Sequence, residues 1–436
     1  MPDENRSNVY KLFRASRVSS DTTIDPTKQQ AFYDPGLGSK MDGGWIKWGW
    51  GRWLYNMVSQ ATGLGITRNL IDCYAEIIRL YEPGDRIWLF GFSRGAYTVR
   101  CVGGVLANCG VPTRRADGTA LRRDPKSIRS IAEEGVKRVY QHGSGRAAER
   151  FREQRKELGR RFRSKYNSGT RDEANVAPYF IGVWDTVAST GVRWPIFLLL
   201  LVAFIVACAV GAYSLHTGFF GGVSFWRLFA ALFLGAGAIG WFLMLVSRFR
   251  ASAKTSHSWF ATVHLTGWRM RFYDQSLNEA VRYAKHALAI DERRRDFARV
   301  AWETPGTRTN DDSWFEQIWF AGNHSDVGGS YPENEARLSD ISLRWMVDRA
   351  QACEFGLDVD DRFLNVSPAS DGMQHDEIKA SILPWAEKVR DIPVDAPLHP
   401  TVLERFKGKA VLHYDETKLY RPDNLKGHSE VTSYFE

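Results

Sequence analysis

Apolar and polar positions along the first part of the chain predict a helix, a strand and a second helix. Residues 87–92 form an uninterrupted apolar run with the length of a buried strand. Small residues recur from Arg94 onward, as in a helix that packs closely against a neighbour. The preceding stretch has helical spacing of its apolar residues, namely Ile66, Leu70, Cys73, Ile77 and Leu80. This alternation is typical of an α/β domain.

Apolar patterns in the remainder of the chain predict further strands and helices. Two more buried strands are predicted at Tyr179–Trp184 and Gln317–Gly322, and Leu338–Cys353 has a clear helical pattern. We also expect an amphipathic helix at Gln275–Ile290. Two polar helices, Ser127–Tyr140 and Arg146–Lys165, are predicted on either side of Gly143-Ser-Gly145.

Two long apolar segments interrupt this pattern. Pro195–Ser214 and Leu228–Ser247 contain no charged residue, and each is about as long as a helix that crosses a bilayer core of roughly 30 Å. Buried core helices are the alternative, but the Trp and Arg residues at the segment ends favour a transmembrane hairpin. Arg193, Arg248, Arg250 and Lys254 flank the hairpin, and its short link carries only Arg227. The positive-inside rule therefore predicts that the large parts on both sides of the hairpin are cytoplasmic and that the link is external.

Charge is concentrated in one block. Residues 114–171 hold 18 Lys or Arg against 7 Asp or Glu, so the excess of this block is larger than the net charge of +8 of the whole chain. Such a block can bind an anionic membrane surface or nucleic acid, or it can be a solvated helical insertion. The five cysteines show no metal-ligand spacing, and the polar start of the chain predicts no cleaved signal peptide.

These patterns divide the chain into five parts. Residues 1–112 begin the α/β domain, 113–175 form the basic helical insertion, and 176–193 add a strand. The hairpin occupies 194–248, and 249–436 complete the domain with a C-terminal extension. The expected fold is an α/β fold with a mostly parallel sheet and helices on both faces, interrupted by the basic helical insertion and the hairpin.

The candidate nucleophile lies between the first predicted strand and its helix. Gly91-Phe-Ser93-Arg-Gly95 matches G-x-S-x-G, the pattern of a nucleophile elbow, in which a sharp turn exposes the serine hydroxyl. We expect both glycines to be needed because side chains would crowd the turn. The N–H of Arg94, at the start of the helix, is a candidate oxyanion donor. A plain strand-to-helix turn with a solvated serine is the alternative.

A catalytic acid and a catalytic base follow in the order that a hydrolase triad requires. Asp185 and His324 each come at the end of a predicted strand, and they follow Ser93 as acid and then base. His324 would accept the Ser93 proton, and Asp185 would orient the imidazole. Asp326 could support the site or cap a turn. His286, expected in mid-helix, and His399 are competing bases, and no metal or cofactor is expected.

Several longer motifs resemble one known family. They are 84–85, 89–100, 183–186, 287–294 and 319–329, within broader similarity over roughly residues 7–110, 178–192, 258–350 and 395–425. The sequence there is similar to domain of unknown function 2235, the catalytic domain of a class of type VI secretion lipase effectors. The resemblance implies an α/β-hydrolase fold and phospholipase A-type ester hydrolysis. It also assigns the nucleophile, acid and base roles to Ser93, Asp185 and His324.

The chain departs from that family pattern in two ways. Members usually open with an apolar strand ending in Asp-Gly-Thr, ahead of the segment that resembles Ser7–Leu12, whereas this sequence begins just after that point. The loop at the end of such a strand would supply a second oxyanion donor. The hairpin is the second departure, because it would hinder passage of a secreted effector through an envelope. A resident membrane enzyme and a secreted toxin therefore both fit.

Three functions are compatible with the sequence. The first is a membrane-anchored serine hydrolase that cleaves glycerophospholipids. The second is an anchored esterase or amidase for soluble substrates, and the third is a non-catalytic membrane scaffold with a decayed hydrolase domain. The expected partners are membrane phospholipids, with an immunity or secretion partner for an effector, and no nucleic acid.

Overall fold

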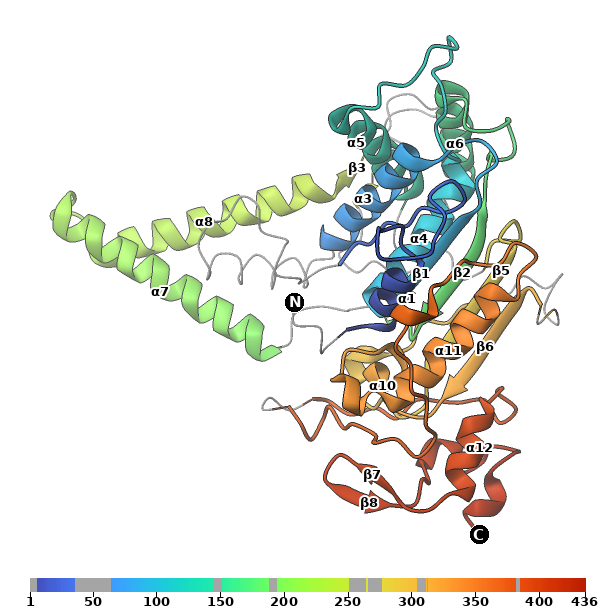
Figure 1. Ribbon diagram of the computed structural model, residues 1–436. Helices are drawn as coiled ribbons and strands as arrows, with labels where there is room; N and C mark the ends of the chain where they lie inside the picture. The colour runs from blue at the N-terminus through green and yellow to red at the C-terminus, as the bar shows by residue number, and fades with distance from the viewer. Residues whose placement is uncertain are drawn as a thin grey trace.

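Four parallel strands form the centre of the protein. The computed structural model describes residues 6–35, 64–143, 151–187, 194–250, 264–265, 277–303, 311, 313–381 and 385–436. In the described residues the sheet has the order β1-β2-β5-β6 (Figure 1). Its strands are β1 (Ile87–Phe92), β2 (Pro178–Trp184), β5 (Tyr283–Ala289) and β6 (Phe315–Phe320). The predicted α/β class and three of the four strands are therefore confirmed.

Side chains alternate between the two faces of this sheet, and each face has its own core. Ile181 and Val183 of β2 join one cluster, whereas Phe180 and Trp184 join the other. The first cluster also contains side chains from α3 (Leu64–Leu80) and α4 (Arg94–Cys109). The second contains side chains from α1 (Asn8–Ser16) and α11 (Arg337–Gln351). Helices thus cover both faces, as expected from the sequence.

The predicted helix at Gln275–Ile290 is wrong, because Tyr283–Ala289 forms strand β5. This strand pairs with β2 on one side and with β6 on the other. Alanine favours helices, and the segment Tyr-Ala-Lys-His-Ala-Leu-Ala contains three alanines. A central strand covered on both faces shows no alternating pattern, so its sequence carries little strand signal. Pairing with two neighbours and burial here override the local preference.

The basic block forms helices that belong to the domain core. It contains α5 (Pro125–Glu133), the π-helix η1 (Glu134–Tyr140) and α6 (Arg152–Tyr166). Ile128, Val136 and Phe162 are buried in the same cluster as α3 and α4. Helices in this block were correctly predicted, but they pack on the sheet domain through an apolar side. The linking residues 144–150 lie outside the described residues.

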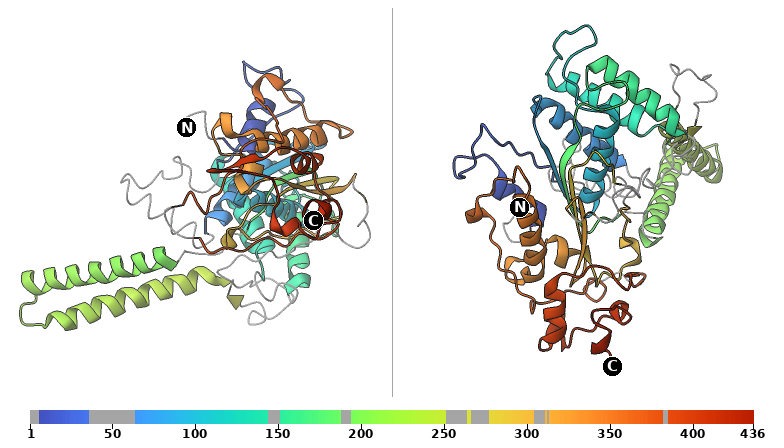
Figure 2. Two further views of the ribbon diagram at one scale, coloured as in Figure 1. Left: turned by 90° about the horizontal axis from the view of Figure 1, so that it is seen from below. Right: turned by 90° about the vertical axis from the view of Figure 1, so that its right-hand side faces the viewer.

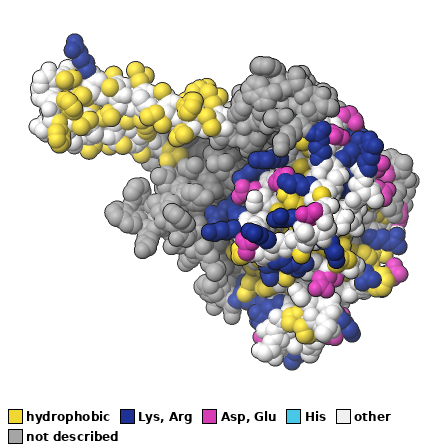
Figure 3. Space-filling view, turned by 90° about the horizontal axis from the view of Figure 1, so that it is seen from above, with side chains coloured by type: hydrophobic (Ala, Val, Ile, Leu, Met, Phe, Trp, Pro, Cys, Tyr) yellow, Lys and Arg dark blue, Asp and Glu magenta, His cyan; other side chains and the backbone are white. Residues whose placement is uncertain are grey.

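The two long apolar segments form helices α7 (Trp194–Gly218) and α8 (Phe225–Arg248), which lie side by side in an arm that projects from the sheet domain (Figures 1 and 2). Many apolar side chains on this arm face outward, including Val210 at 59% and Trp226 at 71% exposure (Figure 3). Within the described residues, Leu200–Gly218 and Phe225–Leu243 have the length and composition that could span a membrane. After the arm, β3 (Phe249–Arg250) pairs with β4 (His264–Leu265).

The C-terminal region packs against the end of the sheet. Its core joins Trp319 of β6 to Val402 and Phe406 of α12 (Pro400–Lys407). The hairpin of β7 (Val411–His413) and β8 (Glu416–Lys418) lies in the same region. The shorter helices are α10 (His324–Gly328), η3 (Arg295–Phe297), η4 (Glu333–Glu335), η5 (Asp361–Phe363), η6 (Asp423–Leu425) and η7 (Thr432–Tyr434).

A buried ion pair fixes α1 to α11. Lys11 Nζ lies 2.9 Å from Asp340 Oδ1, and both side chains are almost inaccessible to solvent. Replacing Lys11 with Met should lower the free energy of unfolding by about 3–5 kcal/mol, because a buried carboxylate loses its cation. Arg17→Met, which breaks an exposed pair with Asp21, should cost at most about 1 kcal/mol. Denaturant unfolding of both variants tests this. Equal losses in the free energy of unfolding would show that the buried pair stabilises the protein no more than the exposed pair does.

Candidate active site

Ser93 occupies a strained turn between β1 and α4. Its backbone has φ 58° and ψ −122°, a conformation that residues other than glycine rarely adopt. The turn is held from two sides, since Ser93 N donates to Trp184 O at 3.1 Å and Ser93 O accepts from Tyr97 N at 3.2 Å. The Ser93 side chain makes no helix-capping hydrogen bond and is partly exposed. The local geometry thus matches the predicted elbow.

The two glycines of the motif have different roles. A Cβ on Gly91 would lie 2.5 Å from the carbonyl oxygen of Gly95, so glycine is required there for the close approach of strand and helix. A Cβ on Gly95 would have no heavy atom within 4 Å. The expected crowding is therefore correct for Gly91 and wrong for Gly95, which faces open space.

Asp185 follows β2 at the same edge of the sheet. Its side chain is fully buried, and its backbone has φ 37°. Oδ1 accepts a hydrogen bond from Ala289 N at 3.1 Å, and Oδ2 lies 2.5 Å from His324 Nδ1. The structure thus brings the predicted acid and base into direct contact, although 139 positions separate them in the sequence.

His324 is the first residue of the short helix α10, which follows β6. Its ring packs between Phe92, with centroids 4.5 Å apart, and Phe297, with centroids 5.0 Å apart. Nε2 is buried and has no hydrogen-bond partner among the described residues. Because Phe92 directly precedes Ser93, the contact with Phe92 also connects the His324 ring to the elbow. A Cβ on Gly328 would collide with the Phe92 ring, so glycine permits this approach.

Asp326 supports the loop that carries His324. Its Oδ2 accepts hydrogen bonds from Asn323 N at 3.0 Å and from His375 N at 3.1 Å, and its Oδ1 lies 2.7 Å from His375 Nδ1. Asn323 in turn caps α10 through its side chain. In the described residues Asp326 has no hydrogen bond to the His324 ring, so its contacts are those of a helix cap.

The two competing histidines make other contacts in the fold. His286 lies in strand β5, contrary to the helical position expected from the sequence, and its ring contacts Gln317 and Thr186. Burial lowers the pKa of His286 to about 3. His399 caps α12 by accepting from Thr401, and burial lowers its pKa to about 4. Both rings are therefore neutral at physiological pH and occupied by structural contacts.

Two further charged residues lie at the site: Arg390 had no signal in the sequence pattern, whereas Glu292 lies within the motif 287–294 but was given no role. Arg390 contacts Asp185 Oδ1 at 2.5 Å and Oδ2 at 2.9 Å, and its side chain is buried. Glu292 accepts from His324 N at 3.2 Å and is itself paired with Arg294. Burial alone would raise the pKa of the Asp185 carboxyl, but the Arg390 guanidinium and the His324 hydrogen bond hold it far below its usual range. Asp185 is therefore ionised at any physiological pH.

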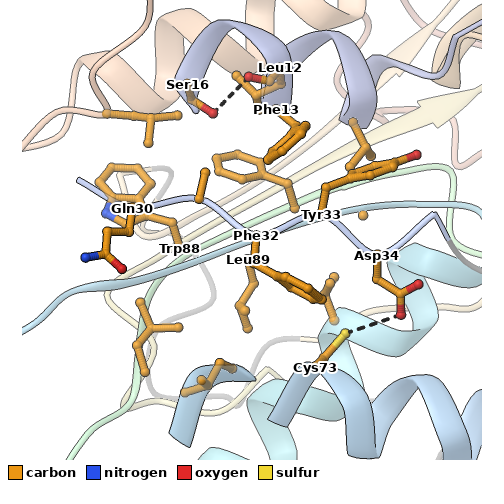
Figure 4. Close-up of a pocket in the computed structure, with 18 of the residues that line it drawn as sticks. Leu12, Phe13, Ser16, Gln30, Phe32, Tyr33, Asp34, Cys73, Trp88 and Leu89 are labelled. Atoms are coloured by element: carbon orange, nitrogen blue, oxygen red, sulfur yellow. Dashed lines mark hydrogen bonds between the residues drawn. The ribbon is translucent and has the colours of Figure 1, made fainter. Parts of the chain in front are cut away.

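Ser93 also lines a large cavity. It has a volume of about 1600 Å³ and extends along β1 towards α1 and residues 26–35. Phe32, Tyr33 and Leu89 line the cavity (Figure 4). At one side the Cys73 thiol donates a hydrogen bond to the Asp34 carboxylate. Much of the wall beside the elbow is therefore apolar and aromatic. In the described residues, no group of three or more His, Cys, Asp and Glu side chains is placed to hold a metal ion.

Comparison with known proteins gives one extensive match. A family model described as "T6SS, Phospholipase effector Tle1-like, catalytic domain" matches residues 1–215 and 232–349. Ser93, Asp185 and His324 all lie within the matched residues, and Arg390 lies beyond them. The unmatched residues 216–231 fall on the tip of the helical arm.

Individual proteins that the chain resembles have low sequence identity to it. An uncharacterized protein of Saccharomyces cerevisiae is 26% identical over 116 residues, which are 24% of this chain and 15% of that protein. A crystal structure of an uncharacterized protein from Pseudomonas aeruginosa is 15% identical, with a TM-score of 0.32, and the match covers 81% of this chain and 43% of that chain. The structure of the Tle1 effector bound to the VgrG spike from the Type 6 secretion system is 16% identical, with a TM-score of 0.26. That match covers 74% of this chain and 40% of that chain. The chain thus spans less than half the length of each of these proteins.

The glycine geometry at the elbow leads to a stability prediction. Gly91→Ala should lower the free energy of unfolding by about 1–3 kcal/mol, because the new methyl group overlaps the backbone of α4. Gly95→Ala is the matched control and should change stability by no more than about 1 kcal/mol, since its methyl group meets no atom and alanine favours a helix. Thermal unfolding of both variants measures the difference. A greater loss for Gly95→Ala would contradict the described packing.

Proposed function

The chain belongs to the family of type VI secretion phospholipase effectors with a Tle1-like catalytic domain, and we propose that it is a serine hydrolase that cleaves ester bonds of membrane glycerophospholipids. One observation carries the proposed mechanism. The Asp185–His324 hydrogen bond of 2.5 Å lies at the edge of the sheet where the strained Ser93 turn leaves β1. In this proposal Ser93 is the nucleophile, His324 the base and Asp185 the buried acid, and these residues directly follow β1, β6 and β2 or begin the next helix.

In this proposal Ser93 Oγ attacks the ester carbonyl carbon while His324 Nε2 accepts its proton. Asp185 accepts the Nδ1–H of the ring, which fixes the tautomer that leaves Nε2 able to act as a base. The N–H of Arg94, at the first position of α4, donates to the oxyanion, and the helix N-terminus favours the negative charge there. The imidazolium then protonates the leaving alcohol, which leaves an acyl ester on Ser93. Water attacks the carbonyl carbon of this ester while His324 Nε2 accepts its proton, and the imidazolium returns a proton to Ser93 Oγ as the fatty acid is released.

The lipid substrate is supported by the family and by two features of this chain. The cavity beside Ser93 is large, and many of the side chains that line it are apolar or aromatic, which suits a fatty acyl ester. The arm of α7 and α8 exposes apolar side chains along its length, and in water such a surface is unfavourable. We propose that the arm crosses a bilayer, with the sheet domain on the cytoplasmic side because the flanking residues are basic.

The arm and the site are close along the chain. Trp194, where α7 begins, follows Asp185 by nine positions, which can span at most about 32 Å. The catalytic edge is therefore held near the proposed membrane surface, and the mouth of the site would face lipid. An immunity or secretion partner would be needed if the enzyme is delivered as an effector, whereas a resident enzyme would need neither.

The triad assignment is tested by kinetics. We expect Ser93→Ala, His324→Ala and Asp185→Asn each to lower kcat for a short-chain ester by about 10⁴-fold or more, and double variants to lose little beyond the single ones, because triad residues act as a unit. His286→Ala is the matched control, since its ring makes structural contacts only, and among folded protein it should retain activity. Losses that multiply in the double variants, or full activity of Ser93→Ala, would contradict the assignment.

The role of the arm is tested by removing it. Replacing residues 195–247 with a short Gly/Ser linker should leave turnover of a soluble short-chain ester nearly unchanged. The same change should strongly reduce hydrolysis of phospholipid in bilayer vesicles, because the enzyme is no longer concentrated at its substrate.

A control with phospholipid dispersed in detergent micelles removes the need for bilayer attachment, so the shortened enzyme should regain activity there. If soluble-ester and bilayer activities fall together, the arm is part of the folded catalytic domain. If neither falls, the arm has no role in presenting lipid, and the enzyme acts on soluble substrates.

A further inference from the structure

Arg390 lies at the centre of the candidate active site, although the segment that carries it is outside the matched family region. The family match ends at residue 349, and Arg390 enters the site from the loop-rich C-terminal part of the chain. Its side chain is 6% exposed, and the carboxylate that it faces is completely buried. A charged side chain of this kind is rarely buried without a specific partner.

The guanidinium is held on three sides. Nη1 donates to Asp185 Oδ1 at 2.5 Å and to Ala289 O at 2.9 Å. Nη2 donates to Asp185 Oδ2 at 2.9 Å and to Phe297 O at 2.9 Å. The two nitrogens thus form a planar fork on the two carboxylate oxygens, a geometry that lysine cannot reproduce.

Asp185 Oδ2 is shared between Arg390 and His324, which lies 2.5 Å away through Nδ1. The carboxylate therefore cannot rotate about its bond without breaking a contact to the guanidinium. The positive charge also offsets the negative charge of Asp185 at short range in a buried site, where electrostatic interactions are strong. An uncompensated carboxylate would favour the protonated ring of His324, which cannot accept a proton from Ser93.

We propose that Arg390 is a positioning residue for the hydrolysis reaction, which fixes the Asp185 carboxylate and limits the negative charge that His324 meets. This inference rests on the proposed function, because it assigns Asp185 and His324 to the triad. It assigns two separable effects to Arg390. The fork orients the acid, and the charge sets the pH range over which the base is unprotonated.

The other charged or titratable groups near His324 are two carboxylates held in pairs, the cation of Arg299 and one neutral imidazole. Glu292 accepts from His324 N and is bonded to Arg294 at 2.6 Å, so their charges largely offset one another. Asp326, on the same helix as His324, is paired with His375 at 2.7 Å. The remaining groups on this side are Arg299, which is partly buried, and the neutral ring of His286. Arg390 is thus the cation that directly contacts the acid of the triad.

The experiment separates charge from orientation with three variants of the full-length protein. Arg390→Met and Arg390→Gln remove the charge, and Arg390→Lys retains the charge but loses the fork. Arg163→Met is the matched control, because Arg163 is also buried and donates to the backbone carbonyls of Asn108, Thr170 and Arg171 on another part of the domain. Circular dichroism and thermal unfolding establish which variants are folded.

Two readouts are compared with those of the wild type. The first is the pH dependence of kcat/KM for a short-chain ester. For both neutral variants, its acidic limb should move to higher pH by about one unit or more, since the charge of Asp185 is no longer offset. For Arg390→Lys the limb should stay in place while kcat falls by about 10²-fold, as expected for a misplaced catalytic group. Arg163→Met should lower stability without moving the limb.

The second readout is the pH midpoint of the His324 ring titration, followed by NMR, which does not require turnover. An upward shift in either neutral variant supports the proposal, and unchanged midpoints in the folded neutral variants overturn the charge effect. Wild-type kcat in Arg390→Lys overturns the role of the fork. If the wild type hydrolyses no ester, the proposed function fails, and the NMR titration still decides whether Arg390 controls His324. If both neutral variants fail to fold, the stability loss exceeds that of Arg163→Met, and the lysine variant decides the role of the fork.

Discussion

The buried carboxylate of Asp185 is the constraint on which the described site depends. An ionised carboxylate inside a protein must be paired and hydrogen-bonded, and here Arg390, His324 and Ala289 N supply the partners. These partners come from three different regions of the chain, so the carboxylate can be satisfied only after β5, α10 and the C-terminal region have packed against the end of β2. The structural requirement of one buried charge thus places the candidate base beside the elbow.

The parallel sheet explains why the candidate residues share one edge. Since the four described strands of the central sheet run in the same direction, the residues that follow β1, β2 and β6 lie at the same edge of the sheet. Along the chain, the apolar arm begins at Trp194, nine positions after Asp185. This short separation limits how far the proposed chemistry can lie from the start of the arm.

The sequence predicted those parts of the structure whose signals are local. The apolar run at 87–92, the motif around Ser93 and the long helices α7 and α8 each have a distinctive pattern within a few residues. Strand β5 lacked such a pattern, because its alanines fit a crowded central strand and also favour a helix. The contrast between Gly91 and Gly95 could not be predicted either, since it depends on the crossing of strand and helix. Arg390 has no motif, and only the folded chain places it on Asp185.

The central claim is that Ser93 is an activated nucleophile. A fluorophosphonate probe, which forms a stable bond with activated serine hydroxyls, tests this directly when the labelled protein is digested and the modified peptide is sequenced by mass spectrometry. We expect one labelled site, at Ser93, with labelling that is lost in the folded Asp185→Asn protein because His324 is no longer held as a base. Labelling at another serine, or an unlabelled Ser93 in the folded wild-type protein, would contradict it.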